Sequence, residues 1–574
     1  MRHECRITKR AALVLLVSCW HLPACGDDDQ PGFDSGPDSQ TTDAGADAGE
    51  SPLSMALGEL HDVEPDASGL AQVTLATPSG DEEFLLMLQS RATALRRLEA
   101  FTIGVTPSSL PQLGLAPPPR LPQARFLSRQ ELEMAEPPAG SLGAPVRCGF
   151  DHQALADLRE RLAGHPAPRG MAPPPPPAPP PDPGDTVQFQ IDATSGLVTI
   201  DASVLHVSSS LVVCLDKTTD PSLELEPTLL QEISDGFEDI ALPRLRDFFG
   251  QESDVNSDGH VTLLFSPLVA DLATAYVNPY DLVTDPELRP AGVAANDQEL
   301  IYITPPQLLD PHMATARAIL ETVSHEFQHA IYFYRKYLLN DQLGGIESIY
   351  VTEGLSGLAQ DLSGYHAGIF FINKSALDSW DLMSVNDLVR SGGAYFSDRP
   401  ELYGGAYLLM RYLFDQAGGE TLLQDGMVDL SGSPGASWLR SLVDSPLLGE
   451  ASIEAASGQA VSSVATDWFT ALMVDDRLDA DSVPLNTDPR YNFLPPTVDP
   501  LTGRQRGTTM FESFMGMVTK TGPIVREAIS ADGVIRAGGA EYLRFAASSP
   551  GTITLQVQAD PERVDPLLRI FRLR

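Results

Sequence analysis

A single segment, residues 310–339, limits most strongly what this chain can fold into. Its apolar residues recur at the spacing of a helix, and it holds few residues that break helices. Asp310-Pro311 opens the segment with a pair that favours the cap and first position of a helix. The spacing therefore predicts a long, largely buried helix, which carries His325 and His329 one turn apart.

Two imidazoles on one helix face suit a tetrahedral zinc ion, which binds histidine nitrogen at roughly 2.0–2.1 Å. Glu326 follows the first histidine, so its carboxylate can reach a water molecule on that metal. Zinc lowers the pKa of the water, and the carboxylate takes its proton as it attacks a carbonyl. The pattern His-Glu-x-x-His also arises by chance in about one chain in a hundred of this length. The competing interpretation is a pair of core histidines with surface acids beside them.

A catalytic zinc needs a third protein ligand and one open position, and the sequence IYVTEGLSGLAQDLSG supplies a candidate. Its apolar residues form a stripe at helical spacing, and Glu353 lies roughly opposite Val351 on that helix. A carboxylate buried there needs compensation, which a metal would supply. Gly354 and Gly357 would let this second helix pack closely on the first. The predicted ligands are His325, His329 and Glu353.

The chain resembles the hyicolysin family of secreted bacterial zinc metallopeptidases in three sequences, HEFQHAIYF, TEGLSGLAQDL and YGGAYLLMRYLFDQAGG. That family belongs to the gluzincins, in which the third ligand is a glutamate on a following helix. FFGQESDVNSDGHVTLLFSPL and NDQELIYI resemble the strands before the zinc helix, so the resemblance covers residues 186–419. It implies a zincin-like catalytic domain of the α+β class, with a mixed sheet and an active-site helix. It also implies endopeptidase activity, with His325, His329 and Glu353 as ligands and Glu326 as general base.

Two supporting roles have more than one candidate. Thermolysin has an aspartate four residues after the third ligand to support a histidine, whereas Gly357 stands at that position here. Asp361, a further turn along, is a candidate substitute, and a backbone carbonyl is the alternative partner for the imidazole. The oxyanion of the tetrahedral intermediate also needs a donor, and the candidates are Tyr403 and Tyr407, with His366 as a third choice. For Tyr407, packing on an apolar helix face is the simpler interpretation.

The sequence DVNSDG matches the start of a calcium-binding loop, with Asp254, Asn256 and Asp258 as oxygen donors. The twelfth position, where a bidentate acid is expected, is Phe265. The flanks suggest a hairpin rather than two helices, and Asp-Gly turns before strands are common for conformational reasons alone. Calcium binding and a purely conformational turn both remain open.

The first residues are typical of an export signal. MRHECRITKR is basic, and AALVLLVSCWHL is apolar but too short to span a membrane comfortably. The run ends in LPACG, which resembles a bacterial lipoprotein signal over residues 1–25, with Cys25 as the lipidated residue. The alternative is an ordinary signal peptide cut nearby. Residues 26–54 are acidic and nearly free of large apolar residues, which predicts a disordered tether.

Only Cys148 and Cys214 lie beyond such a cleavage point. In an exported protein an even pair of cysteines invites a disulfide. Two separate buried thiols are the alternative.

The remaining boundaries follow from composition. Short strand-like runs predict a β-rich domain over residues 55–163, and a run of prolines predicts a linker over residues 164–185. The zinc metallopeptidase domain is expected over residues 186–490. Strand-like runs return near the end, so residues 491–574 are expected to form a second β-rich region, a small sandwich.

The formal net charge of −40 argues against nucleic acid as a partner. The sequence thus predicts a zinc-dependent endopeptidase that acts on proteins or peptides. It would be exported and held at a bacterial membrane or cell surface through lipidated Cys25, or secreted. One alternative is a surface-binding lipoprotein whose peptidase-like body is an inactive or latent scaffold. Another is a zinc hydrolase that acts on a different kind of bond.

Overall fold

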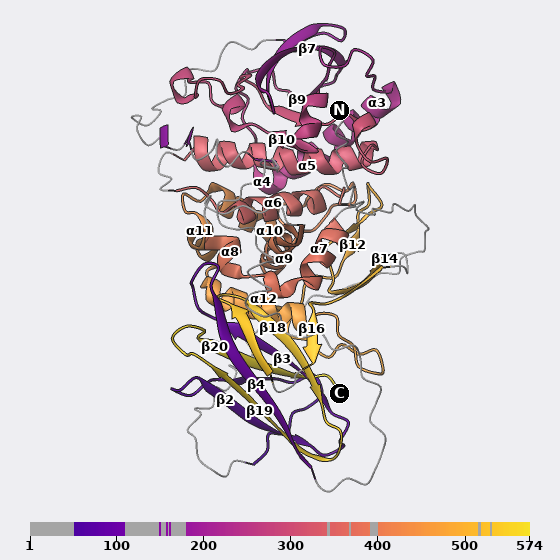
Figure 1. Cartoon of the computed structure of the whole chain (residues 1–574). Coiled ribbons are helices and arrows are strands. Elements are labelled where there is room, and N and C mark those ends of the chain that lie inside the picture. The colour runs from indigo at the N-terminus through magenta and orange to yellow at the C-terminus, as the bar shows by residue number, and fades with distance from the viewer. Residues whose placement is uncertain are drawn as a thin grey trace, which may run out of the picture.

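The computed structural model of the chain describes residues 51–109, 149–150, 157–158, 160–161, 179–340, 345–366, 369–390, 400–514, 518–527 and 531–574. The predicted signal peptide, Cys25 and most of the acidic tether and proline-rich linker lie outside these residues. Figure 1 shows three parts stacked along the molecule, namely a sheet, a helical layer and a β-sandwich. The fold is therefore of the α+β class, as predicted from the sequence.

The sheet has the strand order β5-β10-β11-β9-β8-β7-β6. Its strands are β5 (Gly149–Phe150), β6 (Thr186–Ala193), β7 (Gly196–Val207), β8 (Leu211–Asp216), β9 (Val261–Phe265), β10 (Ala275–Val277) and β11 (Leu300–Ile303). The central strands β8, β9 and β11 are parallel, whereas β10 runs antiparallel to β11. Continuous apolar runs such as VTLLF and LIYI form these central strands because both faces of the sheet are covered.

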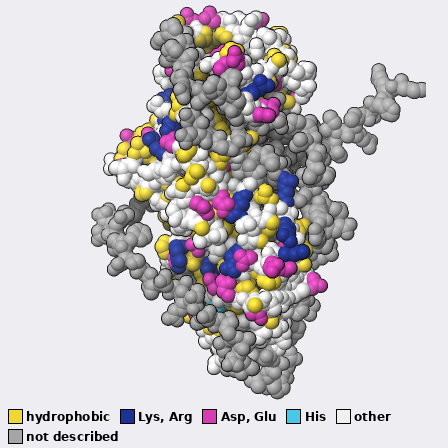
Figure 2. Space-filling view, turned by 90° about the vertical axis from the view of Figure 1, so that its left-hand side faces the viewer, with side chains coloured by type: hydrophobic (Ala, Val, Ile, Leu, Met, Phe, Trp, Pro, Cys, Tyr) yellow, Lys and Arg dark blue, Asp and Glu magenta, His cyan; other side chains and the backbone are white. Residues whose placement is uncertain are grey.

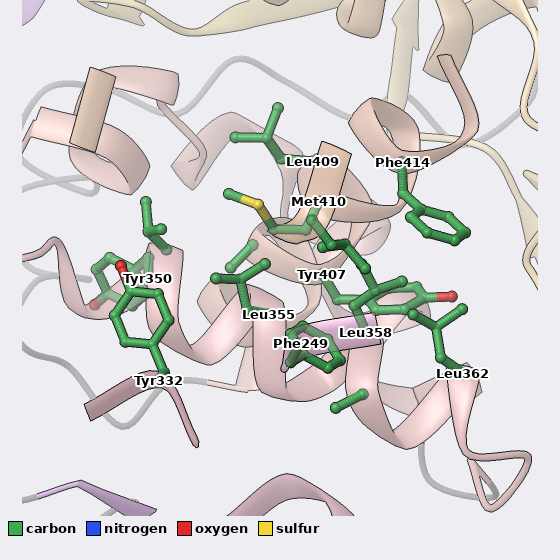
Figure 3. Close-up of a cluster of buried hydrophobic side chains, with 14 of the residues drawn as sticks. Phe249, Tyr332, Tyr350, Leu355, Leu358, Leu362, Tyr407, Leu409, Met410 and Phe414 are labelled. Carbon is green, nitrogen blue, oxygen red and sulfur yellow. The ribbon is translucent and has the colours of Figure 1, made fainter. Parts of the chain in front are cut away.

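A layer of helices lies beneath the sheet (Figure 1). It contains α3 (Pro227–Gly236), α4 (Leu242–Phe249), α5 (Ala316–Phe333), α6 (Ile349–Leu362), α7 (Ile369–Asp378), α8 (Val385–Arg390), α9 (Pro400–Gln416), α10 (Pro434–Asp444), α11 (Gly449–Ser457) and α12 (Val461–Val474). Figure 3 shows where α4, α6 and α9 meet, with Phe249, Leu358 and Met410 in one apolar cluster. Helix α6 packs against both α5 and α9, so it is buried on almost every side.

The predicted start of the long helix is wrong. The helix α5 begins at Ala316, and its cap is Thr315, whose hydroxyl accepts a hydrogen bond from the Ala318 amide at 3.2 Å. Asp310 instead closes a turn, because its carbonyl accepts from the Met313 amide at 2.8 Å. The same polar segment thus contains two residues that can cap a helix, Asp310 and Thr315. The spacing of the apolar residues does not distinguish between them.

The two β-rich regions, predicted as separate flanks, form one sandwich. One of its sheets has the order β1-β20-β3-β18-β16, and the other has the order β17-β4-β19-β2. The strands are β1 (Leu60–Val63), β2 (Leu70–Thr77), β3 (Glu83–Ser90), β4 (Leu98–Ser109), β16 (Val525–Glu527), β17 (Ala531–Arg536), β18 (Ala540–Ala546), β19 (Gly551–Ala559) and β20 (Pro566–Arg572). Each sheet therefore mixes early and late strands, and the two regions share one apolar core.

The sheet and helical layer are thus inserted between the two halves of the sandwich. The sandwich rests on α12, where the Tyr542 hydroxyl donates to the Phe469 carbonyl at 2.8 Å. Strand-like alternation identified these strands, but it carries no information about which distant strand becomes the partner. Short two-stranded ribbons lie before the late strands, namely β12 (Thr497–Val498) with β13 (Gln505–Arg506), and β14 (Phe511–Phe514) with β15 (Val518–Thr521).

Acidic and basic side chains are interspersed over the middle of the face shown in Figure 2. Some of the acidic side chains of the chain are paired, as in the contact between Arg335 and Asp444 at 2.7 Å. Within the part of the chain that the structure describes, no helix has the length and apolar character needed to cross a membrane.

Candidate metal centre

Helix α5 lies between strand β10 on one side and helix α6 on the other. Its two histidines differ in environment, because the His325 side chain is 16% exposed whereas that of His329 is 1% exposed. The helix also buries Phe327 and Ile331 in the main apolar core. Packing on both sides therefore fixes the helix, and one imidazole of the pair still reaches solvent.

The three predicted ligands converge. The Nε2 atoms of His325 and His329 lie 3.2 Å apart. From the neighbouring helix, the Glu353 carboxylate lies 3.2 Å from His325 Nε2 and 3.7 Å from His329 Nε2. Ligand atoms of all three residues lie within 4.8 Å of one another, and they form the only such acidic or histidine cluster found among the described residues. The structure confirms the prediction that these three side chains lie together.

The Glu353 carboxylate is fully buried, and neither of its oxygens has a hydrogen-bond partner apart from the two imidazoles it faces. A buried anion of this kind is unstable unless a cation compensates it. A divalent metal bound by this carboxylate and two neutral imidazoles would supply that charge. The chemistry and placement of these three side chains therefore fit a bound metal ion.

The packing of α6 explains the residue that follows this ligand. A Cβ atom on Gly354 would lie 2.6 Å from the Ala406 carbonyl and 2.8 Å from Met410 Cγ, both on α9. Only glycine allows the two helices to approach this closely. The close approach holds the backbone of Glu353 in place opposite α5.

Glu326 is buried beside the cluster, with a relative exposure of 3%. The Oε2 atom of its carboxylate has no hydrogen-bond partner. Burial raises the pKa of Glu326 to about 8, against the opposing effect of His325. A general base works best when its pKa lies near the working pH, so this environment suits proton transfer close to neutrality.

Two residues that the sequence analysis did not select support His325. Its Nδ1 atom lies 3.4 Å from Gln360 Oε1, and Ser356 Oγ lies 3.2 Å from its Nε2. An acceptor at Nδ1 fixes the tautomer that leaves Nε2 free to bind a metal. Gln360 follows Glu353 by two helical turns and so shares its face, which is a signal that the sequence did contain.

Asp361 does not support a histidine of the cluster, so its predicted role is wrong. Its buried carboxylate instead accepts from Tyr407 at 2.9 Å and from Arg411 at 3.0 Å. It also lies 3.4 Å from Nδ1 of His366. Asp361 follows Gln360 by one residue, and one residue along a helix rotates the side-chain direction by about 100°. This rotation is enough to point the Asp361 side chain away from α5.

The two predicted oxyanion donors both lie on α9. Tyr407 is fully buried, and its hydroxyl is engaged by Asp361, which favours the packing role that its apolar surroundings indicated. Tyr403 lies one turn earlier on the same helix and is partly buried. His366, the third choice, belongs to the Asp361 network. A catalytic role for either tyrosine stays a prediction.

The predicted calcium loop lies between α4 and β9, so the suggested hairpin is wrong. Its side chains bond within the loop. Asp254 accepts from the Gly259 amide at 3.1 Å, and the Asn256 amide group donates to Asp258 at 2.8 Å. These bonds account for the turn without an ion. Calcium binding at Asp254, Asn256 and Asp258 stays a prediction.

Cys214 lies in the apolar core on the outer face of the sheet and forms no disulfide with another described residue. Burial raises its pKa to about 12. Cys148 lies outside the described residues. The disulfide between them therefore stays a prediction.

No protein-family model matches the chain, and no curated protein matches it either. The resemblance to the hyicolysin family accordingly stays a prediction.

Proposed function

We propose that this chain is an exported zinc-dependent endopeptidase that hydrolyses peptide bonds in proteins or peptides. The observation that carries the proposal is the convergence of His325, His329 and Glu353, whose buried carboxylate faces the two imidazoles and has no other hydrogen-bond partner. Two histidines and one glutamate, with a position left for water, are a donor set that zinc hydrolases use. Sequence features at residues 1–25 support export and a lipid anchor on Cys25 as part of the same proposal.

Zinc, when bound, would lower the pKa of a coordinated water molecule and polarise the carbonyl to be cleaved. Glu326 takes the proton from that water, because its Oε2 atom is free of other partners and its pKa is raised to about 8. The same carboxyl group then passes the proton to the leaving amine. Gln360 holds the His325 ring, with its Nδ1 atom 3.4 Å from the amide oxygen.

The same types of donor also bind non-haem iron, which catalyses redox chemistry. Glu326 favours the hydrolytic assignment, because a buried carboxylate beside the ligands offers a proton acceptor that hydrolysis needs. Elemental analysis of purified protein distinguishes the two metals. We expect about one zinc ion per chain and little iron.

The functional test uses residues 26–574 and a reduced, carboxymethylated lysozyme as an unfolded substrate. Mass spectrometry of the products identifies new peptide termini, which separates an endopeptidase from a hydrolase that cuts another kind of bond. The control is Glu232→Gln, which changes an exposed glutamate on α3. We expect fragments from wild type and from this control but not from Glu326→Gln. Intact substrate in every sample, with zinc bound, would overturn the proposal.

A further inference from the structure

The loop between α4 and β9 contains the sequence DVNSDGH, residues 254–260. In an EF-hand calcium loop, side-chain oxygens stand at positions 1, 3 and 5, glycine at position 6 and a backbone carbonyl at position 7. Here these positions are held by Asp254, Asn256, Asp258, Gly259 and His260. The loop thus supplies part of a calcium shell, but the acid expected at position 12 is missing, because Phe265 stands there.

Glu299, the residue before β11, brings a carboxylate to this loop from another part of the chain. Its Oε1 atom accepts a hydrogen bond from the Val255 amide at 3.1 Å. Val255 lies between Asp254 and Asn256, so the carboxylate faces the start of the loop. Backbone pairing fixes this placement, because the Glu299 carbonyl accepts from the Thr262 amide of β9 at 2.8 Å.

The second carboxylate oxygen of Glu299 is buried and unpaired. The residue is 2% exposed, and its Oε2 atom has no hydrogen-bond partner. Burial raises the pKa of Glu299 to about 7 against the opposing effect of nearby polar groups, and the charge of Asp254 raises it further. A buried carboxylate that faces a second carboxylate needs a cation to be stable in its ionised form. Hydrogen bonds within the loop explain the turn, but they do not explain this unpaired oxygen.

We propose that the loop and Glu299 together form a calcium site, in which Glu299 replaces the acid missing from position 12. Its ligands are the side-chain oxygens of Asp254, Asn256, Asp258 and Glu299 and the carbonyl oxygen of His260. Three carboxylates and two neutral oxygens, completed by water, suit calcium, a hard cation that takes about six to eight oxygen ligands. Asp254 is exposed to solvent, so an ion has access to the loop.

The three carboxylates do not all lie within 4.8 Å of one another, so they are less tightly gathered than the ligands of the candidate metal centre. Calcium accepts a flexible geometry, and its binding draws the loop and Glu299 together. The ion then links the segment before β9 to the start of β11, two neighbouring parallel strands of the sheet. This role is structural, and it does not depend on the proposed peptidase activity.

The test measures binding of CaCl2 to residues 26–574 by isothermal titration calorimetry. The protein is stripped of metal on a chelating resin and reloaded with one equivalent of zinc, so that calcium does not enter the candidate metal centre. Glu299→Gln keeps the shape of the side chain and an acceptor for the Val255 amide but removes the charge. Asp254→Asn makes the same change within the loop. The control is Glu232→Gln, which removes an exposed charge on α3.

We expect one calcium ion per chain in wild type and in Glu232→Gln, with a Kd of about 10⁻⁴–10⁻³ M, the range of extracellular calcium modules. Glu299→Gln and Asp254→Asn should each raise this Kd about tenfold or more, because the number of ligand charges sets the affinity. Added calcium should raise the thermal unfolding midpoint of wild type but not that of Glu299→Gln. Without calcium, Glu299→Gln should be at least as stable as wild type, because it removes a buried charge that has no partner.

A wild-type Kd above about 10⁻² M would overturn the proposal, because it lies beyond the range of protein calcium sites. A Kd that is unchanged in Glu299→Gln would also overturn it, because the loop alone would then bind the ion. If Glu299→Gln does not fold, Glu299→Asp is tested in the same way, because it keeps the charge but withdraws the carboxylate from the loop. An unchanged Kd in that variant would likewise overturn the proposal.

Discussion

His325 and Glu353 face each other at 3.2 Å between nitrogen and carboxylate oxygen, although they lie on different helices. Burial alone would lower the pKa of His325, but the hydrogen bond and charge of Glu353 outweigh it and raise the pKa to about 9. A raised histidine pKa stabilises the metal-free protein fully below pH 6.5, and that contribution is lost as the pH rises through 9. The bound proton and a metal ion compete for the same nitrogen.

Zinc affinity should therefore depend on pH. Below pH 9 each zinc ion must displace the proton of His325, so the apparent affinity should rise about tenfold per pH unit for one proton. Competition with a chelator at pH 6.5, 7.5 and 8.5 measures this slope. Glu326→Gln is the matched background, because it removes the other titrating carboxylate of the site. A flat profile would show that His325 carries no proton in the metal-free protein.

Gln360→Ala should weaken zinc binding. The substitution removes the acceptor at His325 Nδ1, and loss of such supporting partners typically lowers metal affinity or activity about 10- to 100-fold. Gln360→Glu keeps an acceptor and should retain most of the affinity. The zinc Kd is compared for both variants and wild type. An unchanged Kd in Gln360→Ala would mean that another group orients the imidazole.

Asp361→Asn should destabilise the fold rather than the metal site. Burial alone would raise the pKa of Asp361, but His366 and Arg411 outweigh it and hold the pKa below its ordinary value of 3.8. Removing one partner of a buried ion pair typically costs about 3–5 kcal/mol. Urea unfolding measures this loss, which should be present at pH values above 3.8 and should shrink as the pH falls through the lowered pKa.

The zinc Kd of a folded Asp361→Asn protein serves as the control for this prediction. It should match that of wild type, because Asp361 bonds to Tyr407 and Arg411 rather than to the ligands. A large loss of zinc affinity with unchanged stability would reinstate Asp361 as a supporting residue of the metal centre.

Leu555→Ala should loosen both halves of the sandwich together. Leu555 of β19 is fully buried and pairs with Val73 of β2 and Val105 of β4. Truncating a buried leucine costs about 2–5 kcal/mol. Hydrogen exchange should speed up in residues 70–77 and 98–107 as well as in β19. Leu197→Ala, at an exposed position, is the control. Unchanged exchange in the early strands would contradict a shared core.

The sequence predicted the convergence of the three candidate ligands better than it predicted the overall arrangement. His325, His329 and Glu353 were identified because helical spacing fixes which side chains share a face. The helix start was misplaced, because the cap at Thr315 depends on a hydroxyl geometry that the surrounding polar residues do not reveal. Asp361 and a backbone carbonyl were the predicted partners of the imidazole, whereas the structure places Gln360 beside His325.

The joining of early and late strands in one sandwich could not be predicted, for a physical reason. Alternating residues show that β4 and β19 are strands, but pairing between them depends on contacts across the whole chain. The same holds for β5, whose two residues carry no strand periodicity of their own. Its position beside Val277 becomes visible only when the sheet is assembled.

The most direct test of the proposed function is the turnover of unfolded protein by wild type and by Glu326→Gln at matched zinc content. We predict that the variant keeps its zinc and loses nearly all of kcat, because the Glu326 carboxylate is the proposed proton acceptor beside the ligands. Undiminished cleavage by zinc-loaded Glu326→Gln would contradict it and would assign the proton transfer to another group.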